Sequence, residues 1–408
     1  MYTFKILIST KHTQEKGGIM LSKRIQTLSA SLTIAISSLA RDLKAEGKDV
    51  ISFSAGEPDF DTPIAVKDAA KQALDDGLTK YTAVAGTPKL LQAVADKLKR
   101  ENGLDYSPNQ ILTSNGAKHS LFNLFQAVID EGDEVIIPAP YWVTYPELVN
   151  YASGVSVIID TNDESGFKIT PEQLKSAITS KTKMLVLTSP SNPTGAVYSE
   201  DELKALAEVL KDTNIIIASD EMYEKLVFGN TKFVATASIS QDMYNRTITI
   251  NGLSKSAAMT GWRFGYLASA NTELISVMNK LQSQSTSNIN SLTQSAAIVG
   301  LDGTIDKEVE EMRVAFESRC NEAVELFNAV DGLSVVKPNG AFYLFVNIKE
   351  ISNDSMKFCK DLLEDQGVAV VPGVGFGSEG YFRFSFATNI ETIKIGIKRI
   401  ETFIQKKK

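Results

Sequence analysis

The sequence predicts an α/β fold in which helices cover both faces of a mostly parallel sheet, together with a smaller α+β part. The first observation is a series of short apolar runs rich in β-branched residues, as in buried strands. These runs are ILTSN (111–115), EVIIPAP (134–140), KMLVLTSP (183–190), NIIIASDE (214–221) and TITING (247–252). The second observation is that helical patterns lie between several of the runs, and strands that alternate with helices form parallel sheets.

Two segments between the predicted strands show the helical pattern most clearly. HSLFNLFQAVIDEG (119–132) follows the first strand, and SEDELKALAEVLKD (199–212) follows the third. The second segment opens with a serine that can cap a helix and continues with acidic residues in its first turn. We therefore place a large α/β domain at 66–309.

The C-terminal part has a different pattern. From about residue 310, long charged helical segments surround GAFYLFVNI (340–348) and YFRFSFA (381–387). Both stretches alternate as half-buried antiparallel strands do, which predicts a smaller α+β domain over 310–408. We expect residues 20–65, which contain the Pro-rich boundary GEPDFDTP, to return and pack on this domain. Residues 1–19 are interpreted as a leader or a misassigned start, with Met20 as the biological start.

Composition excludes several classes of function. A formal net charge of -7 over 408 residues argues against a nucleic-acid partner, because phosphate backbones require a basic surface. No run reaches the roughly 18 apolar residues of a membrane span. Cys320 and Cys359 are far apart and His12 and His119 are the only histidines, so we expect no disulfide framework and no metal site. These features favour a cytoplasmic protein.

Five functional-looking residues follow the predicted strands at their carboxyl ends, where open α/β sheets bind ligands. They are Lys118, Trp142, Asn192, Asp220 and Lys255. Each has an ordinary alternative when taken alone: a solvated lysine, a core aromatic, a turn asparagine or a helix cap at Asp220. Their shared position at one sheet edge predicts a common site.

Six motifs, in chain order, resemble those of class I/II aminotransferases of the pyridoxal-phosphate (PLP) fold type I. They are AGEPDFDTP, PYWVTYP, SPSNPTG, SDEMYEKL, GLSKSAAMTGWRFG and YFRFSFAT. The resemblance extends from about Met20 to the end of the chain and is closest to bacterial aspartate aminotransferases of subgroup Ib. It implies the PLP-dependent transferase fold type I and PLP as the cofactor.

The resemblance implies a role for each residue around the cofactor ring. Lys255 would bind the cofactor covalently and then move the proton between the reacting carbons. Asp220 would keep the pyridine nitrogen protonated, and Tyr223 and Asn192 would hydrogen-bond the phenolate oxygen. Trp142 would stack on the ring.

The resemblance also implies how the cofactor phosphate is held. It assigns the contact to a helix N-terminus and to nearby cations and hydroxyls, namely Gly116, Ala117, Lys118, Ser254, Arg263 and, from a second subunit, Tyr81. The contribution of Tyr81 would require a homodimer. Many relatives have a serine where this chain has Gly252, and Ser254 is the candidate replacement. Phe264 is a minor departure from the usual aliphatic residue.

The substrate contacts follow from the same resemblance. Arg383 and the backbone of Gly56 would bind the α-carboxylate, with Trp142 and Asn192 beside it. The segment QSQSTSNIN (282–290) offers no arginine for a side-chain carboxylate, so Lys118, with Ser31 and Thr33, would serve. Ser29 stands where relatives that accept prephenate have a basic residue, which predicts weak prephenate activity.

These observations predict an aminotransferase that moves an amino group from L-aspartate to 2-oxoglutarate, giving oxaloacetate and L-glutamate by a ping-pong mechanism. Two enzymatic alternatives remain: an aminotransferase for aromatic, prephenate or neutral amino acids, and a fold type I C–S β-lyase. A PLP-binding regulator is the alternative from another class, but nothing before residue 50 is long or basic enough for a DNA-binding domain. The expected partners are amino-acid and keto-acid substrates and a second copy of the chain.

Overall fold

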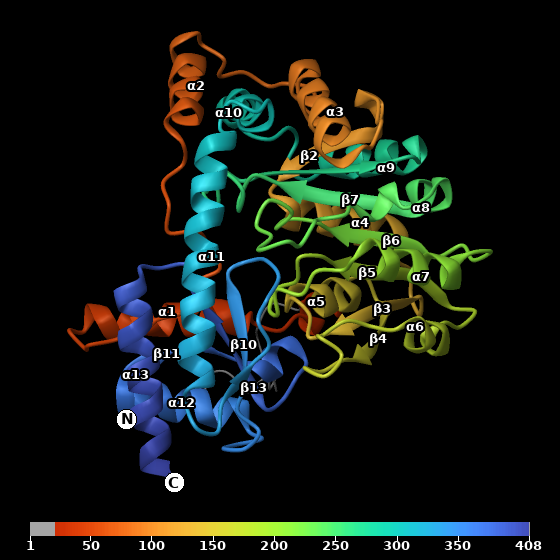
Figure 1. The fold of residues 1–408 in the computed structure, drawn as a ribbon. Helices are drawn as coiled ribbons and strands as arrows, with labels where there is room; N and C mark the ends of the chain where they lie inside the picture. The colour runs from red at the N-terminus through yellow and green to blue at the C-terminus, as the bar shows by residue number, and fades with distance from the viewer. Residues whose placement is uncertain (1–20, 408) are drawn as a thin grey trace.

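A seven-stranded mixed sheet is the largest sheet in residues 21–407, which are the residues that the computed structural model describes (Figure 1). The interpretation of Met20 and residues 1–19 concerns positions outside this range. In spatial order the strands are β2 (Ile111–Asn115), β8 (Phe264–Ser269), β7 (Thr247–Gly252), β6 (Ile216–Asp220), β5 (Thr182–Thr188), β3 (Glu134–Ala139) and β4 (Val155–Asp160). Strand β8 alone runs in the direction opposite to the other six strands of this sheet.

Helices cover both faces because the strands are apolar on both sides. Val135 and Ile137 pack on one face, while Ile136 between them joins the core of the other face. The helices of the first face are α4 (Ala117–Val128), α5 (Thr144–Tyr151) and α9 (Thr272–Ser283). Those of the second are α6 (Pro171–Ala177), α7 (Glu200–Leu210) and α8 (Gln241–Arg246).

A third group of helices packs near β2 and β8. It consists of α2 (Ile64–Asp75), α3 (Pro88–Asn102) and α10 (Ser291–Leu301). The start of α7 agrees with its sequence pattern, because Ser199 and Glu202 form a capping box. The start of α7 is therefore encoded locally.

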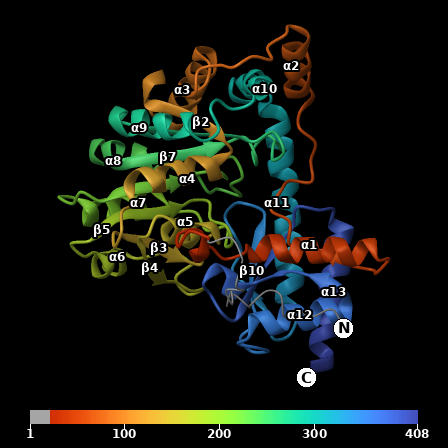
Figure 2. The ribbon, with the colours of Figure 1, turned by 180° about the vertical axis from the view of Figure 1, so that it is seen from behind.

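The C-terminal part is built on a four-stranded sheet joined to the large part by a long helix, α11 (Asp306–Asn328), as Figures 1 and 2 show. Its strands are β12 (Val371–Pro372), β13 (Tyr381–Ser385), β10 (Tyr343–Asn347) and β9 (Ser334–Val335). Two further helices, α12 (Ser355–Gln366) and α13 (Ile390–Lys407), pack against each other. The predicted boundary at 309/310 falls in the first turn of α11, and the domain limits remain a prediction.

Part of the N-terminal segment lies on the C-terminal part. Strand β1 (Ile51–Ser52) pairs in parallel with β11 (Val368–Ala369), and α1 (Leu32–Ala45) contacts β11 and β12. Short 3₁₀ helices occur at Ile25–Thr27, Pro108–Gln110, Thr236–Ser238 and Gly373–Phe376. The N-terminal segment thus packs on the C-terminal part through α1 and β1.

The fold class is confirmed, but one detail of the C-terminal strands is wrong. Strands β10 and β13 pair antiparallel as expected, yet they are not half-buried. Every residue of β13 is buried, and so are four of the five in β10. The alternation reflects aromatic side chains that pack on both faces, including Phe384 against Phe53 on one of them.

Candidate active site

A cleft of about 440 Å³ opens at the carboxyl ends of the large sheet, and residues of the C-terminal part also line it. The cleft brings together most residues predicted from the sequence. These are Thr33, Gly56, Ala117, Lys118, Trp142, Asn192, Asp220, Tyr223, Ser254, Lys255, Arg263 and Arg383. Ser31 lines an adjoining cavity together with Lys118, and Gly116 is the N-cap of α4. Tyr81 lies outside the cleft wall and is 90% exposed.

Lys255 follows β7 and extends its amine into the cleft, where Nζ donates to the backbone carbonyl of Gly56. Burial lowers the pKa of this amine to about 8, and the nearby guanidinium of Arg383 contributes to the shift. Neutral lysine is therefore accessible near neutral pH, as a nucleophile or a base requires. The interpretation as a solvated surface lysine is wrong.

Asp220 ends β6 and is 5% exposed. Its Oδ2 accepts a hydrogen bond from the hydroxyl of Tyr145 at 2.7 Å, and its Oδ1 accepts from the backbone N–H of Met222 at 3.3 Å. Burial nevertheless raises the pKa of this carboxyl, and it outweighs the two hydrogen bonds and the charge of Lys255, which act in the opposite direction. No helix follows until Thr236, so Asp220 is not a helix cap. A cationic partner in the cleft would satisfy this carboxylate.

Arg383 lies on β13 and is 1% exposed, so it is a buried residue and not one on the surface. Its guanidinium donates to Asn192 Oδ1 at 2.9 Å and to the carbonyl of Ser54 at 2.8 Å. The same group lies 4.4 Å from the ring centre of Tyr343. No carboxylate pairs with Arg383 among the described residues, and its Nε lacks a partner there. A planar cation in this state is suited to bind a carboxylate ligand.

The start of α4 forms a cradle for an anion. Within the described part of the chain, the backbone N–H groups of Ala117 and Lys118 have no acceptor, as is usual at a helix N-terminus. Gly116 leaves the space that Arg263 needs, because a Cβ there would lie 2.4 Å from Arg263 Nη2. Ser254 is 6% exposed and lines the same cleft. The free N–H groups, the guanidinium and the hydroxyl fit a phosphate.

Close packing explains the glycine at position 252, where many relatives have a serine. A Cβ at this position would lie 2.6 Å from the carbonyl oxygen of Phe264 on the paired strand β8. A serine could not be accommodated here without a shift of the strands. Ser254 is thus the hydroxyl that this backbone permits near the cradle.

Lys118 extends from α4 beside Trp142, with Nζ 4.8 Å from the ring centre. Burial and the charge of Arg263 lower the pKa of its amine. The Oγ1 of Thr33 has no hydrogen-bond partner among the described residues and faces the same cleft. Trp142 is partly buried: it packs against the edge of the hydrophobic core and also lines the cleft.

The sequence did not reveal three cleft residues that contact the predicted ones. Tyr145 and Thr188 form a hydroxyl chain to Asp220, with 2.8 Å between their oxygens. The hydroxyl of Tyr343 is 2.9 Å from that of Tyr223. Burial raises the pKa of Tyr223 well above its usual value, so its phenol is a neutral donor. Tyr145 lies in the motif PYWVTYP, but its contact with Asp220 spans 75 positions and leaves no local signal.

The described residues contain no group of three or more His, Cys, Asp or Glu side chains placed to hold a metal ion. Between residues 21 and 407, no helix has the length and apolar character needed to cross a membrane.

Comparisons with known proteins agree with this geometry. A family model described as aminotransferase class I and II matches residues 48–400. An aspartate aminotransferase of Bacillus subtilis is 48% identical over 391 residues, which cover 95% of this chain and 99% of that protein. An aspartate/prephenate aminotransferase of Nitrosomonas europaea is 47% identical, with 94% and 99% covered. A solved Thermus thermophilus aspartate aminotransferase with maleate has a TM-score of 0.91 and 41% identity, with 94% and 100% covered.

Class I and II aminotransferases use pyridoxal phosphate and act on amino acids and keto acids. The cleft fits that cofactor, because an anion cradle, a low-pKa lysine and a buried carboxylate face the same space. The match over most of the chain, with relatives nearly half identical along their whole length, shows that this protein belongs to the class I and II aminotransferase family.

Proposed function

We propose that the protein transfers the amino group of L-aspartate to 2-oxoglutarate, giving oxaloacetate and L-glutamate in two half-reactions. The observation that carries this proposal is the presence of two cations from separate elements in one cleft, Arg383 on β13 and Lys118 on α4. A dicarboxylate has one carboxylate for each. The relatives named as aspartate aminotransferases, and the maleate in one of them, support the same substrate class.

The proposed chemistry divides among the residues of the cleft. Pyridoxal phosphate, when bound, supplies an electron-withdrawing ring that stabilises negative charge at the substrate Cα. The Lys255 amine removes the proton from the substrate Cα. It then returns a proton to the second reacting carbon, on the other side of the nitrogen that is transferred. Asp220 holds a proton at the pyridine nitrogen, and the Tyr145 hydroxyl keeps the Asp220 carboxylate oriented. Tyr223 and Asn192 donate hydrogen bonds to the ring oxygen, while Arg383 fixes the α-carboxylate.

We also propose that the enzyme acts as a cytoplasmic homodimer in which Tyr81 contacts the partner's cofactor phosphate. Tyr81 is 90% exposed, although a tyrosine usually covers part of its ring. Ile64, Leu74 and Leu78 on and after α2 are also at least 49% exposed. This apolar surface would be covered by a second copy.

Prephenate is the second candidate substrate, because some of the relatives are named aspartate/prephenate aminotransferases. Ser29 provides no positive charge near the cleft, and its backbone N–H donates to Glu147 at 2.8 Å. A carboxylate at this position disfavours a further anionic group on the substrate. We therefore propose that activity with prephenate is weak.

The experiment that tests the function incubates the PLP-loaded protein with a panel of amino acids and keto acids. Formation of oxaloacetate from aspartate, dependent on 2-oxoglutarate, is the expected result, and Lys255→Ala serves as the inactive control. Release of pyruvate and ammonia without a keto-acid acceptor would indicate a β-lyase instead. Faster exchange with aromatic or neutral amino acids than with aspartate would overturn the substrate assignment.

A further inference from the structure

The loop that follows β6 begins directly after Asp220 and carries Tyr223, but it has no regular secondary structure over residues 221–226. Backbone hydrogen bonds hold it at separate points, from Glu221 N–H to Ile250 and from Ala341 N–H to Leu226. Inside the loop, Glu224 N–H donates to the carbonyl of Glu221 and Leu226 N–H to that of Tyr223, so the loop consists of turns, and its contacts with α3 are made by side chains. The position of the Tyr223 phenol therefore depends on what holds the neighbouring residues.

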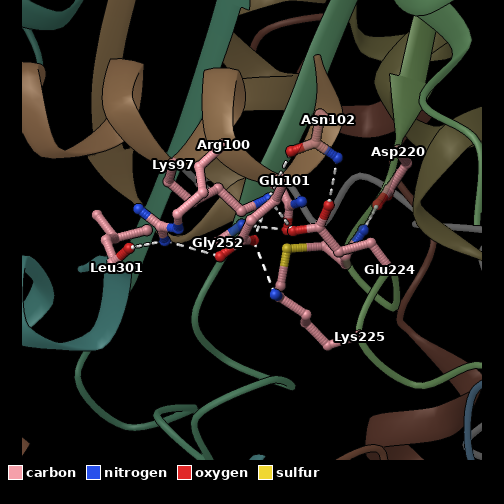
Figure 3. A network of polar contacts seen from close by, with 11 residues as sticks. Lys97, Arg100, Glu101, Asn102, Asp220, Glu224, Lys225, Gly252 and Leu301 are labelled. Carbon is pink, nitrogen blue, oxygen red and sulfur yellow. Dashed lines mark hydrogen bonds and ion pairs between the residues drawn. The ribbon is translucent and has the colours of Figure 1, made fainter. Parts of the chain in front are cut away.

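A buried ionic cluster lies on the side of this loop that faces α3, as Figure 3 shows. Lys97 and Glu224 are 4% and 8% exposed, and they form an ion pair between α3 and the loop. Asn102, at the end of α3, donates to the second oxygen of Glu224 at 2.8 Å and accepts from Lys97 Nζ at 2.8 Å. Glu224 is therefore held by two residues of one helix.

Lys225, the next residue of the loop, is held by an ion pair in which the loop supplies the cation and the helix supplies the carboxylate. Lys225 Nζ lies 2.8 Å from Glu101 Oε2, and Glu101 is one turn after Lys97 on α3. Burial would raise the pKa of Glu101, but the charges of Lys97 and Lys225 outweigh it and hold that pKa below its usual value. Glu224 on the loop thus pairs with Lys97 on α3, and Lys225, the next loop residue, pairs with Glu101. Because the charges are reversed between these two contacts, they define a single alignment of the loop along the helix.

Stability alone does not explain this pair. Removing two charges from water is costly, and a buried ion pair is often no more stable than apolar side chains of similar volume. The pair does fix geometry, because both partners are enclosed and have defined hydrogen bonds. Tyr223 immediately precedes Glu224, and its hydroxyl has only the one partner, Tyr343, among the described residues.

We propose that the ion pair of Lys97 and Glu224 positions Tyr223 and Asp220 for the reaction from outside the cleft. Neither Lys97 nor Glu224 lines the cleft, so they are positioning residues and not catalytic ones. The inference rests on the proposed function, because it assigns its effect to the proton-moving and cofactor-binding groups of that site.

Helix α3, which carries Lys97, also connects the Lys97–Glu224 pair to the segment around Tyr81. Thr87 caps the start of α3 and its backbone N–H donates to Gln294, which also donates to Thr82 beside Tyr81. One end of α3 thus adjoins the segment proposed to reach the partner subunit, and the other end holds the loop of its own site. A rigid helix of 15 residues links the two.

The test compares wild type with the double variant Lys97→Met/Glu224→Leu, which removes both charges and keeps similar side-chain volumes. The control is Lys394→Met/Glu322→Leu, which removes a lysine–glutamate pair between α13 and α11, away from the cleft. Thermal unfolding and amide hydrogen exchange of residues 221–228 are measured on the cofactor-free proteins. The pH dependence of the cofactor absorbance, kcat and KM are measured on the loaded proteins.

We expect the double variant to unfold within a few degrees of wild type but to exchange the loop amides about tenfold faster or more, because they lose their anchor. Its kcat should fall about 10- to 100-fold, since a misplacement near 1 Å can have an effect of about 10². KM for aspartate should stay within about twofold because the substrate cations are untouched. The absorbance midpoint should shift by about half a pH unit or more, since Tyr223 would hydrogen-bond the cofactor under the proposed function.

A double variant that does not fold, or that matches the control in exchange, absorbance and kcat, would assign the pair to stability alone and overturn the inference. The proposed function is tested separately by wild type. If wild type binds the cofactor but does not transfer the amino group of aspartate, the function fails whatever the variant does.

Discussion

Replacing Lys118 with methionine tests the substrate assignment most directly. Methionine keeps most of the side-chain stem, so contact with the Trp142 ring is preserved while the charge is lost. Among residues 21–407 no carboxylate pairs with the Lys118 amine, so it is available to a ligand bound in the cleft. A hydrogen bond to a charged group contributes about 1.5 to 3 kcal/mol, which corresponds to about a 10- to 150-fold loss in kcat/KM.

The assay measures kcat/KM of Lys118→Met for L-aspartate and for L-alanine at saturating cofactor. The loss should be confined to aspartate, because alanine has no side-chain carboxylate to pair with the amine. Lys89→Met, which removes an exposed lysine at the start of α3, is the matched control and should change neither value. An equal loss for both substrates would mean that Lys118 serves the cofactor phosphate, and the reasoning from two cations would be refuted.

Three further predictions concern the groups around the proposed cofactor. Lys255→Ala should lower transamination by more than the roughly 10²- to 10⁴-fold attributed to acid–base catalysis alone, and borohydride reduction of wild type should label the Lys255 peptide. A label on Lys118 would contradict this assignment. Asp220→Asn should still bind the cofactor but slow Cα proton removal about tenfold or more in stopped-flow absorbance. Without the carboxylate charge the ring nitrogen is not kept protonated, so the ring withdraws electrons less strongly. Turnover within twofold of wild type would exclude the role. The lowered pKa of Lys255, about 8, also predicts that the cofactor-free protein gains stability as pH rises from about 8 towards 10.5, because the unfolded chain binds more protons there. This gain should be below about 3 kcal/mol, because the amine faces an open cleft, and Lys255→Met should lack it in calorimetric unfolding scans; equal pH dependence of the two proteins would refute the assigned pKa.

The large sheet could be predicted from the sequence because each of its strands is indicated by the residue types within the strand itself. Each central strand is a short β-branched run, and the start of α7 is marked by its own capping residues. The burial of β10 and β13 on both faces could not be predicted in this way. Their alternating pattern is the same whether the second face meets solvent or a layer of phenylalanines, and that layer comes from distant segments such as Phe53.

The site was predictable to the same extent. Residues at the carboxyl ends of parallel strands must converge, so Lys118, Asn192, Asp220 and Lys255 could be placed together without coordinates. The residues that hold them could not, because a contact such as that between Lys97 and Glu224 spans 127 positions. A lysine in the middle of a charged helix has the pattern of a solvated face, and only the fold buries it.

The electrostatics of the cleft explain why these separate features belong to one function. Four cations line it, Lys118, Lys255, Arg263 and Arg383, against the carboxyl groups of Glu57 and Asp220, in a protein whose net charge is -7. Burial and mutual repulsion lower the pKa values of Lys118 and Lys255, so the cleft holds its positive charge at an energetic cost in the absence of anions. A bound phosphate and two bound carboxylates would reduce that cost at three different places in the cleft. The charge of Arg383 lowers the pKa of Lys255, so a carboxylate that neutralises Arg383 would let this pKa rise. If an anionic substrate binds at Arg383 as proposed, it should therefore raise the affinity of Lys255 for a proton at the step in which the proposed mechanism uses this amine as a base.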